Sequence, residues 1–185
     1  IARNLAECGH PIIALSRDAV SLGLAGAEFA EIQADSITIT CDLADRADIA
    51  AAAEQIKAKA GWIAGIVHNA GIITPIKSIA EVDRANWARN IQINLVGVQD
   101  LTNRLMAVLG GEKQTRISTI SSGASLRAIS GWSAYCVAKA GLDMWAKCMA
   151  EEGAENNISA ISIAPGIVDT DMQKTIRSSN EDDFP

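Results

Sequence analysis

Short apolar runs alternate with longer helix-forming stretches along the chain. The runs are bounded by turn residues, as expected for strands buried on both faces, and they occupy residues 11–15, 36–41, 62–67, 117–120 and 158–163. The stretches between them favour helices at residues 20–33, 46–60, 84–109 and 134–150. This alternation predicts an α/β fold with a doubly wound parallel sheet. Neither a repeat nor a linker interrupts it, so we expect a single domain over residues 1–185.

The composition favours a globular protein and excludes several kinds of partner. A hydrophobic content of 49% and a formal charge of −6 over 185 residues suit a soluble domain with a substantial core. There are 16 basic and 22 acidic residues and no basic stripe, so we expect no nucleic-acid partner. No long apolar run or signal segment is present, so we expect no membrane association and a cytoplasmic location. The four cysteines are scattered, which favours reduced thiols and no metal site.

The stretch around Tyr135 and Lys139 carries the main chemical signal. The two residues are four apart in a helical stretch, so they share a helix face. An ammonium near a phenol lowers the pKa of the phenol from about 10, which helps a tyrosine to exchange a proton. Ser122 follows the strand at 117–120 and can converge with Tyr135 on one carbonyl oxygen. Its neighbour Ser121 is the weaker candidate, because alternation along the strand end should turn it away.

Several motifs together resemble the short-chain dehydrogenase/reductase family, in the family's order and at its spacings. Besides Ser122 and Tyr135-x-x-x-Lys139, they are His68-Asn69-Ala70-Gly71, Asn94 and Pro165-Gly166. The resemblance covers essentially the whole chain. It implies a Rossmann-like domain that binds NAD(P) and catalyses reversible hydride transfer to a carbonyl. The same fold can also serve a regulator that binds a dinucleotide without catalysis.

The resemblance assigns a role to each residue of a catalytic tetrad. Ser122 would hold the carbonyl oxygen and Tyr135 would deliver the proton. Lys139 would lower the pKa of the tyrosine and bind the nicotinamide ribose. Asn94 interrupts the apolar stripe of the helix at 84–109, and a buried amide must find partners. By resemblance, Asn94 would kink that helix and hold a water that links Lys139 to solvent.

The adenosine end of the cofactor is expected beside the first two strands. Ser16 and Arg17 follow the strand at 11–15, where an arginine suits a 2′-phosphate, so we expect NADP. The alternative makes Ser16 a helix N-cap and Arg17 a solvated residue. By resemblance, Asp42 would accept a hydrogen bond from the adenine amino group, and the backbone amide of Leu43 would contact the adenine ring. Asp42 is equally suited to a simple turn.

The nicotinamide end is expected beside two later turns. Asn69, Ala70 and Gly71 are small enough for the backbone to pass close to the cofactor. His68 departs from the asparagine usual in the family and could bond strand-end carbonyls in its place. After the last strand, Pro165 and Gly166 force a turn, where backbone groups of Val168 and the Thr170 hydroxyl could fix the nicotinamide carboxamide.

The two ends of the sequence depart from the family pattern. The chain begins at Ile1 inside a helical stretch, without the strand and glycine-rich turn that begin such folds. From Met172 it is polar, and a substrate-covering helix and a last strand are missing. We therefore expect a chain truncated at both ends. Because the first strand would lie at the centre of the sheet, its loss should leave two unpaired edges and an unstable monomer.

The substrate is indicated by residues around the tyrosine. The segments 131–136 and 169–173 resemble the branch that contains sepiapterin reductase and the benzil reductases, which reduce a carbonyl next to a flat ring. Trp132 could form an aromatic wall of the pocket or simply pack at the helix start, and Met172 would border the pocket. A generic 3-oxoacyl or sugar-alcohol dehydrogenase is the alternative. The apolar face at Leu142 and Trp145 suits a core or a subunit interface, and we expect a homodimer or homotetramer.

Overall fold

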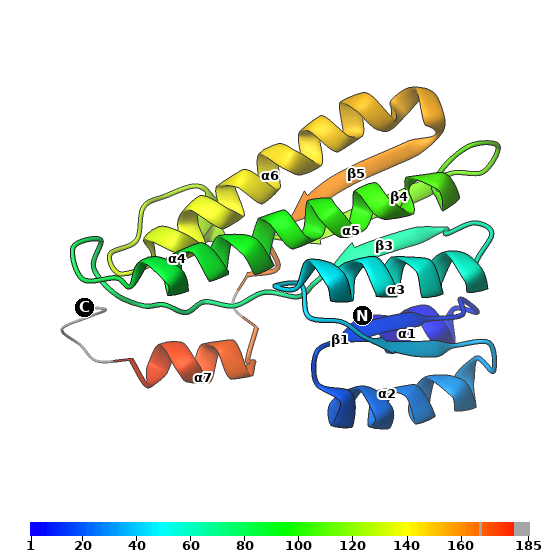
Figure 1. Cartoon of the computed structure of the whole chain (residues 1–185), viewed down its shortest axis with the longest axis horizontal. Helices are drawn as coiled ribbons and strands as arrows, with labels where there is room; N and C mark the ends of the chain where they lie inside the picture. The colour runs from blue at the N-terminus through cyan, green and yellow to red at the C-terminus, as the bar shows by residue number, and fades with distance from the viewer. Residues whose placement is uncertain (167, 180–185) are drawn as a thin grey trace. The chain divides into compact units, whose positions relative to one another are not determined.

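The structure is a computed structural model, and it describes residues 1–166 and 168–179. It confirms the α/β class, because the described strands pair in parallel and helices alternate with them along the chain. The chain divides into two compact units, Ile1–Gly61 and Trp62–Pro185 (Figure 1). Among the described helices, none combines the length and the apolar character that crossing a membrane requires.

The first unit contains a two-stranded parallel sheet. β1 (Ile13–Ser16) pairs with β2 (Ile37–Thr40), from Ile13 opposite Ile37 to Ser16 opposite Thr40. α2 (Ala19–Ile32) links the two strands and packs on both, while α1 (Ala2–Glu7) precedes β1 and α3 (Arg46–Lys59) follows β2. The buried side chains of this unit include Ala6, Leu22, Phe29, Ile39, Ile49, Ala52, Ala53 and Ile56.

Aspartates begin both long helices of the first unit. Asp18 caps α2 by accepting a hydrogen bond from the Val20 amide at 3.0 Å, and Asp45 caps α3 through the Ala47 amide at 2.7 Å. The alternative in which Ser16 caps α2 is wrong. Ser16 ends β1, and its hydroxyl accepts from the Asp18 amide at 3.2 Å.

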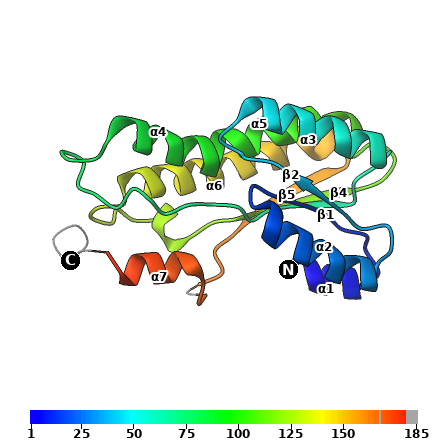
Figure 2. The same ribbon diagram turned by 60° about the horizontal axis from the view of Figure 1, so that its bottom comes forward.

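The second unit contains a three-stranded parallel sheet in the order β3-β4-β5. β3 (Gly65–His68) and β5 (Ile158–Ile163) lie on either side of β4 (Thr115–Ile120). α6 (Ser133–Gly153) packs along β4 and β5, and α4 (Arg84–Ile91) packs against α6 (Figure 2). The buried side chains of this unit include Ile93, Val98, Leu101, Leu105, Leu109, Ile117, Ala138, Leu142, Ala146 and Ile158.

The helix expected over residues 84–109 is divided into four parts. After α4 the chain makes a π-helical turn over Gln92–Val96, then α5 (Gly97–Leu105) and a 3₁₀ turn over Met106–Val108. The fully buried Asn94 lies in the middle of the π-helical turn. The backbone hydrogen bonds of the helix therefore change their spacing at Asn94, in the segment where a kink was expected.

The other departures concern strand edges and the carboxyl-terminal part. Within the described residues, β1 pairs only with β2 and β3 only with β4. The expectation that no helix follows the last turn is wrong, because α7 spans Asp171–Arg177. Met172 lies in the first turn of this helix and not in a polar tail.

Candidate active site

Lys139 and Tyr135 lie one turn apart on α6, and both are buried, with 3% and 6% of their surface exposed. The Lys139 Nζ donates to the Ile120 carbonyl at the end of β4, at 2.6 Å. It also lies 5.5 Å from the centre of the Tyr135 ring. Burial lowers the pKa of Lys139 to about 8, although the charge of Asp143 opposes that shift. An ammonium is therefore held beside the phenol at neutral pH.

Ser122 is positioned by the turn that follows β4. It begins the 3₁₀ turn Gly123–Ser125, and its hydroxyl accepts from the Ala124 amide at 3.2 Å. The Ser122 carbonyl in turn accepts from the Ser125 amide at 3.0 Å and from the Ser125 hydroxyl at 2.8 Å. Because the Ser122 hydroxyl accepts a hydrogen bond from a backbone amide, its own proton remains available for another acceptor. The hydroxyl is near enough to Tyr135 to lower the pKa of the phenol.

The pKa of Tyr135 differs from the expectation. Burial raises the pKa of the phenol, and the hydrogen bond from Ser122 only partly opposes this shift. The predicted lowering by Lys139 is not found. The physical reason is that a buried phenolate is poorly solvated, while the ammonium is directed at the Ile120 carbonyl. The protonated form of Tyr135 is therefore the stable one at neutral pH.

Asn94 fixes the loop that follows β3. Its Oδ1 accepts from the Ile72 amide at 2.9 Å, and its Nδ2 donates to the Ile72 carbonyl at 2.8 Å and to the Asn90 Oδ1 at 2.7 Å. Asn90, also fully buried, donates to the Thr74 carbonyl at 2.8 Å. The two amides clamp this loop against the helix. Asn90 was missed from the sequence, although its position one turn before Asn94 is a usable signal.

Gly71 brings the loop up to the tetrad. A side-chain carbon placed on Gly71 would lie 2.9 Å from the Asn94 Oδ1 and 3.5 Å from the Lys139 Nζ. Only glycine therefore fits between these two groups without displacing one of them. Asn69 and Ala70 precede it in an exposed segment at the carboxyl end of β3.

Tyr135 belongs to an apolar cluster. Its buried members are Ile73, Ala124, Trp132 and Tyr135, and the partly buried side chains packed on them are Ile76, Ile129, Cys136, Met172 and Ile176. The Trp132 and Tyr135 rings meet edge to face with centroids 5.9 Å apart. The predicted substrate residues Trp132 and Met172 are thus brought together with Tyr135. Trp132 also occupies the N-cap position of α6, so the packing interpretation holds as well.

His68 has a structural environment. Its Nε2 lies 2.9 Å from the Thr102 hydroxyl, whose own proton is donated to the Val98 carbonyl, so Nε2 carries the histidine proton. Burial lowers the pKa of His68 to about 4, which keeps the ring neutral. The expectation that it bonds strand-end carbonyls is wrong, because Thr102 is its partner. Within the part of the chain that the structure describes, no group of His, Cys, Asp or Glu forms a possible metal site.

The remaining cofactor candidates lie on exposed or half-buried turns. Ser16 and Arg17, at the end of β1, and Asp42 and Leu43, after β2, belong to the first unit. Asp42 accepts from the Ala44 amide at 2.8 Å, as a turn aspartate does. In the second unit Pro165, Gly166, Val168 and Thr170 are exposed between β5 and α7, and Gly166 adopts a φ of 77°. Their proposed contacts with a cofactor stay predictions.

Comparison with known proteins identifies the family. The family described as short chain dehydrogenase matches residues 1–181, and the chain belongs to it. It is 38% identical to a benzil reductase ((S)-benzoin forming) of Saccharomyces cerevisiae, over 75% of this chain and 54% of that protein. It is 39% identical to a benzil reductase ((S)-benzoin forming) of Bacillus subtilis, over 64% of this chain and 50% of that protein. The chain thus spans about half the length of these curated relatives.

The fold has a close structural counterpart as well. The crystal structure of the KRED1-Pglu enzyme superposes with a TM-score of 0.87 at 29% identity, covering 100% of this chain and 76% of that one. Members of the short-chain dehydrogenase family are oxidoreductases that use NAD or NADP.

Proposed function

We propose that the natural protein is an NADPH-dependent carbonyl reductase that transfers hydride to a ketone or a vicinal dicarbonyl of the benzil or sepiapterin kind. The observation that carries this proposal is the buried Lys139 ammonium beside the Tyr135 ring, on the border of the apolar cluster with Trp132, with Ser122 near enough to affect the pKa of the phenol. The benzil reductase relatives, at 38% and 39% identity, support the same substrate class.

The site fits a dinucleotide. The loop after β3 exposes the small residues Asn69 and Ala70, and Gly71 leaves the approach to Lys139 and Asn94 free of a side chain. Backbone groups of this loop and the Lys139 ammonium would hold the nicotinamide half. In the bound state NADPH would supply the hydride that adds to the carbonyl carbon.

The side chains of this chain then handle the oxygen and the proton. Ser122 and Tyr135 would donate hydrogen bonds to the carbonyl oxygen, which gains the electron pair of the C=O π bond as hydride adds to carbon. Tyr135 would give its proton to that oxygen and become a phenolate, which the adjacent Lys139 ammonium stabilises. Because burial keeps Tyr135 protonated at neutral pH, the site suits proton donation and therefore reduction.

The choice of NADP is supported by the end of β1. Asp18 is the acidic residue nearest this turn, but its carboxylate accepts from the Val20 amide and the Ser21 hydroxyl at the start of α2. Arg17 is exposed beside it. Because the Asp18 carboxylate is already used in capping α2, it is less available to a ribose hydroxyl, while the exposed Arg17 guanidinium suits a 2′-phosphate.

A substrate comparison tests the proposal. The natural full-length protein is assayed for NADPH consumption with benzil, sepiapterin and an acetoacetyl thioester, with Tyr135→Phe as the inactive control. We expect kcat/KM to be highest for a dicarbonyl. Preference for the thioester would contradict the substrate class, and cofactor binding without turnover of any carbonyl would indicate a regulator.

We also propose a homodimer or homotetramer. Leu142 is fully packed in the core, but Val137 and Met144 on α6 are 51% and 57% exposed. Apolar side chains on an exposed helix face favour a subunit contact. Light scattering of the protein as it elutes from a size-exclusion column should give the mass of two or four chains. The mass of one chain would contradict this assignment.

A further inference from the structure

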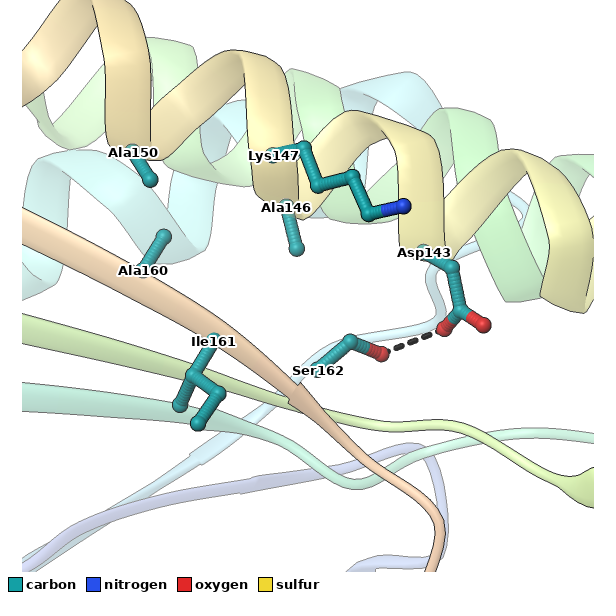
Figure 3. Close-up of a pocket in the computed structure, with 7 residues that line it drawn as sticks. All are labelled: Asp143, Ala146, Lys147, Ala150, Ala160, Ile161 and Ser162. Carbon is teal, nitrogen blue, oxygen red and sulfur yellow. Dashed lines mark hydrogen bonds between the residues drawn. The ribbon is translucent and has the colours of Figure 1, made fainter.

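Asp143 lies on α6 one turn beyond Lys139, facing the sheet. Its carboxylate accepts from the Ser162 hydroxyl on β5 at 2.5 Å, and Figure 3 shows this bond at the edge of a pocket of ≈ 320 Å³. Ser162 in turn accepts from the hydroxyl of Thr119, a fully buried residue of β4, at 3.0 Å. A chain of hydroxyl donors therefore runs from the centre of the sheet to this carboxylate.

The carboxylate also has a lowered pKa. Burial alone would raise the pKa of Asp143, but the neighbouring serine hydroxyls, among them the bonded Ser162, and the charge of Lys139 lower it overall. Asp143 thus stays ionised.

The same carboxylate faces the buried ammonium. Within the described residues, the Lys139 ammonium donates one hydrogen bond, to the neutral Ile120 carbonyl, and a buried charge with so few partners is costly. Around Lys139, Asn94 and Gly71 contribute neutral groups, and Tyr135 contributes a protonated phenol. Lys147, one turn after Asp143, extends along α6 toward the carboxylate (Figure 3). Among these neighbours, Asp143 supplies the negative charge.

We propose that Asp143 is a positioning residue of this active site: anchored to β5 by Ser162 and one helical turn from Lys139, its carboxylate keeps the Lys139 ammonium charged. It acts through Lys139 and does not touch the substrate. The inference rests on the proposed reductase function, since the charge of Lys139 matters there for stabilising the Tyr135 phenolate. It assigns a task to a residue outside the predicted tetrad.

The test compares Asp143→Asn with a matched control, Glu151→Gln. Asparagine keeps the size of the side chain and an acceptor for Ser162 but removes the charge, while Glu151 is an exposed carboxylate on the same helix. In the unchanged protein, kcat should fall as pH rises through about 8, where Lys139 loses its proton. In Asp143→Asn this fall should begin about one pH unit lower. The variant would then be about five-fold slower at pH 8 and nearly unaffected near pH 6.

Further variants distinguish an electrostatic role of Asp143 from a purely structural one. Asp143→Glu should restore the original pH profile in part, and Glu151→Gln should leave it unchanged. A loss of kcat that is equal at all pH values, together with a lower melting temperature, would show a structural role only and overturn the proposal. So would an unchanged profile.

A second measurement does not depend on the reaction. The Lys139 ammonium is titrated by NMR, with Lys139→Met for assignment, in the unchanged protein and in Asp143→Asn. A lower Lys139 pKa in the variant supports the inference even if no carbonyl is reduced, and an unchanged pKa refutes it. Failure of the proposed function appears separately, as an absence of turnover in the unchanged protein.

Discussion

The substitution Gly71→Ala tests how closely the loop after β3 is packed against the tetrad. The added methyl carbon would lie 2.9 Å from the Asn94 Oδ1, where ordinary contact begins at 3.4 Å, so the Asn94 amide has to move by about half an ångström. Both hydrogens of that amide and its oxygen are used in hydrogen bonds to Ile72 and Asn90. Breaking one buried bond of this kind costs about 1–3 kcal/mol.

The same displacement should affect catalysis and stability together. If Asn94 and Lys139 hold their positions in the transition state, 1–3 kcal/mol corresponds to a loss in kcat of about 5–150-fold. The assay is NADPH-dependent reduction of benzil, with urea unfolding of the same protein. Gly61→Ala is the matched control, since a side-chain carbon on Gly61 meets nothing within 4 Å.

A double variant sharpens this prediction. In Asn94→Ala the amide that the new methyl would strike is absent, so adding Gly71→Ala should cost little more. Two full, additive losses would mean that Gly71 acts by another route, such as direct contact with a cofactor. Equal kcat and stability for Gly71→Ala and Gly61→Ala would refute the packing argument itself.

Three further predictions concern other parts of the protein. Tyr135→Phe should lower turnover by about 10²–10⁴-fold and spare NADPH binding, because only the proton donor is lost, and a rate above about a tenth of normal would exclude the assignment. Arg17→Ala should weaken NADPH binding far more than NADH binding in parallel titrations, and equal losses would return Arg17 to a solvated role. His68 has its pKa lowered to about 4 from an unfolded value of 6.5, so the stability of the neutral ring is full above pH 6.5 and is lost as pH falls toward 4. Urea unfolding should therefore show a loss of about 3 kcal/mol over that window, and His68→Asn should remove it; a slope that persists in the variant would point to other groups.

The fold class could be read from the sequence because burial on both faces leaves a simple pattern. The runs at 36–41 and 158–163 correspond to β2 and β5. The position of the tetrad was equally accessible. The chain has a single tyrosine, and its spacing from Lys139 and from a serine at a strand end restricts where the three side chains can meet.

Other features depend on tertiary contacts that no local pattern encodes. The direction of the Tyr135 pKa shift follows from burial, which outweighs the hydrogen bond from Ser122. Asn90 and Asp143 resemble ordinary helix residues until their partners Thr74 and Ser162, distant in sequence, are known. Ser16 was a reasonable helix cap by propensity, but the strand extends through it and leaves the cap to Asp18.

The π-helical turn Gln92–Val96 has a consequence for how this helix could change by insertion or deletion. A π turn is an α-helix that accommodates one extra residue, and each residue of an α-helix turns the chain by about 100°. Removing one residue from this turn would give an uninterrupted and locally more regular helix. If the residue removed lies between Asn90 and Asn94, their spacing would fall from four residues to three, so that the two amides could no longer bond each other and the loop after β3 in the present way. Single-residue deletions in this turn should therefore leave the helix folded but lower the activity of the site.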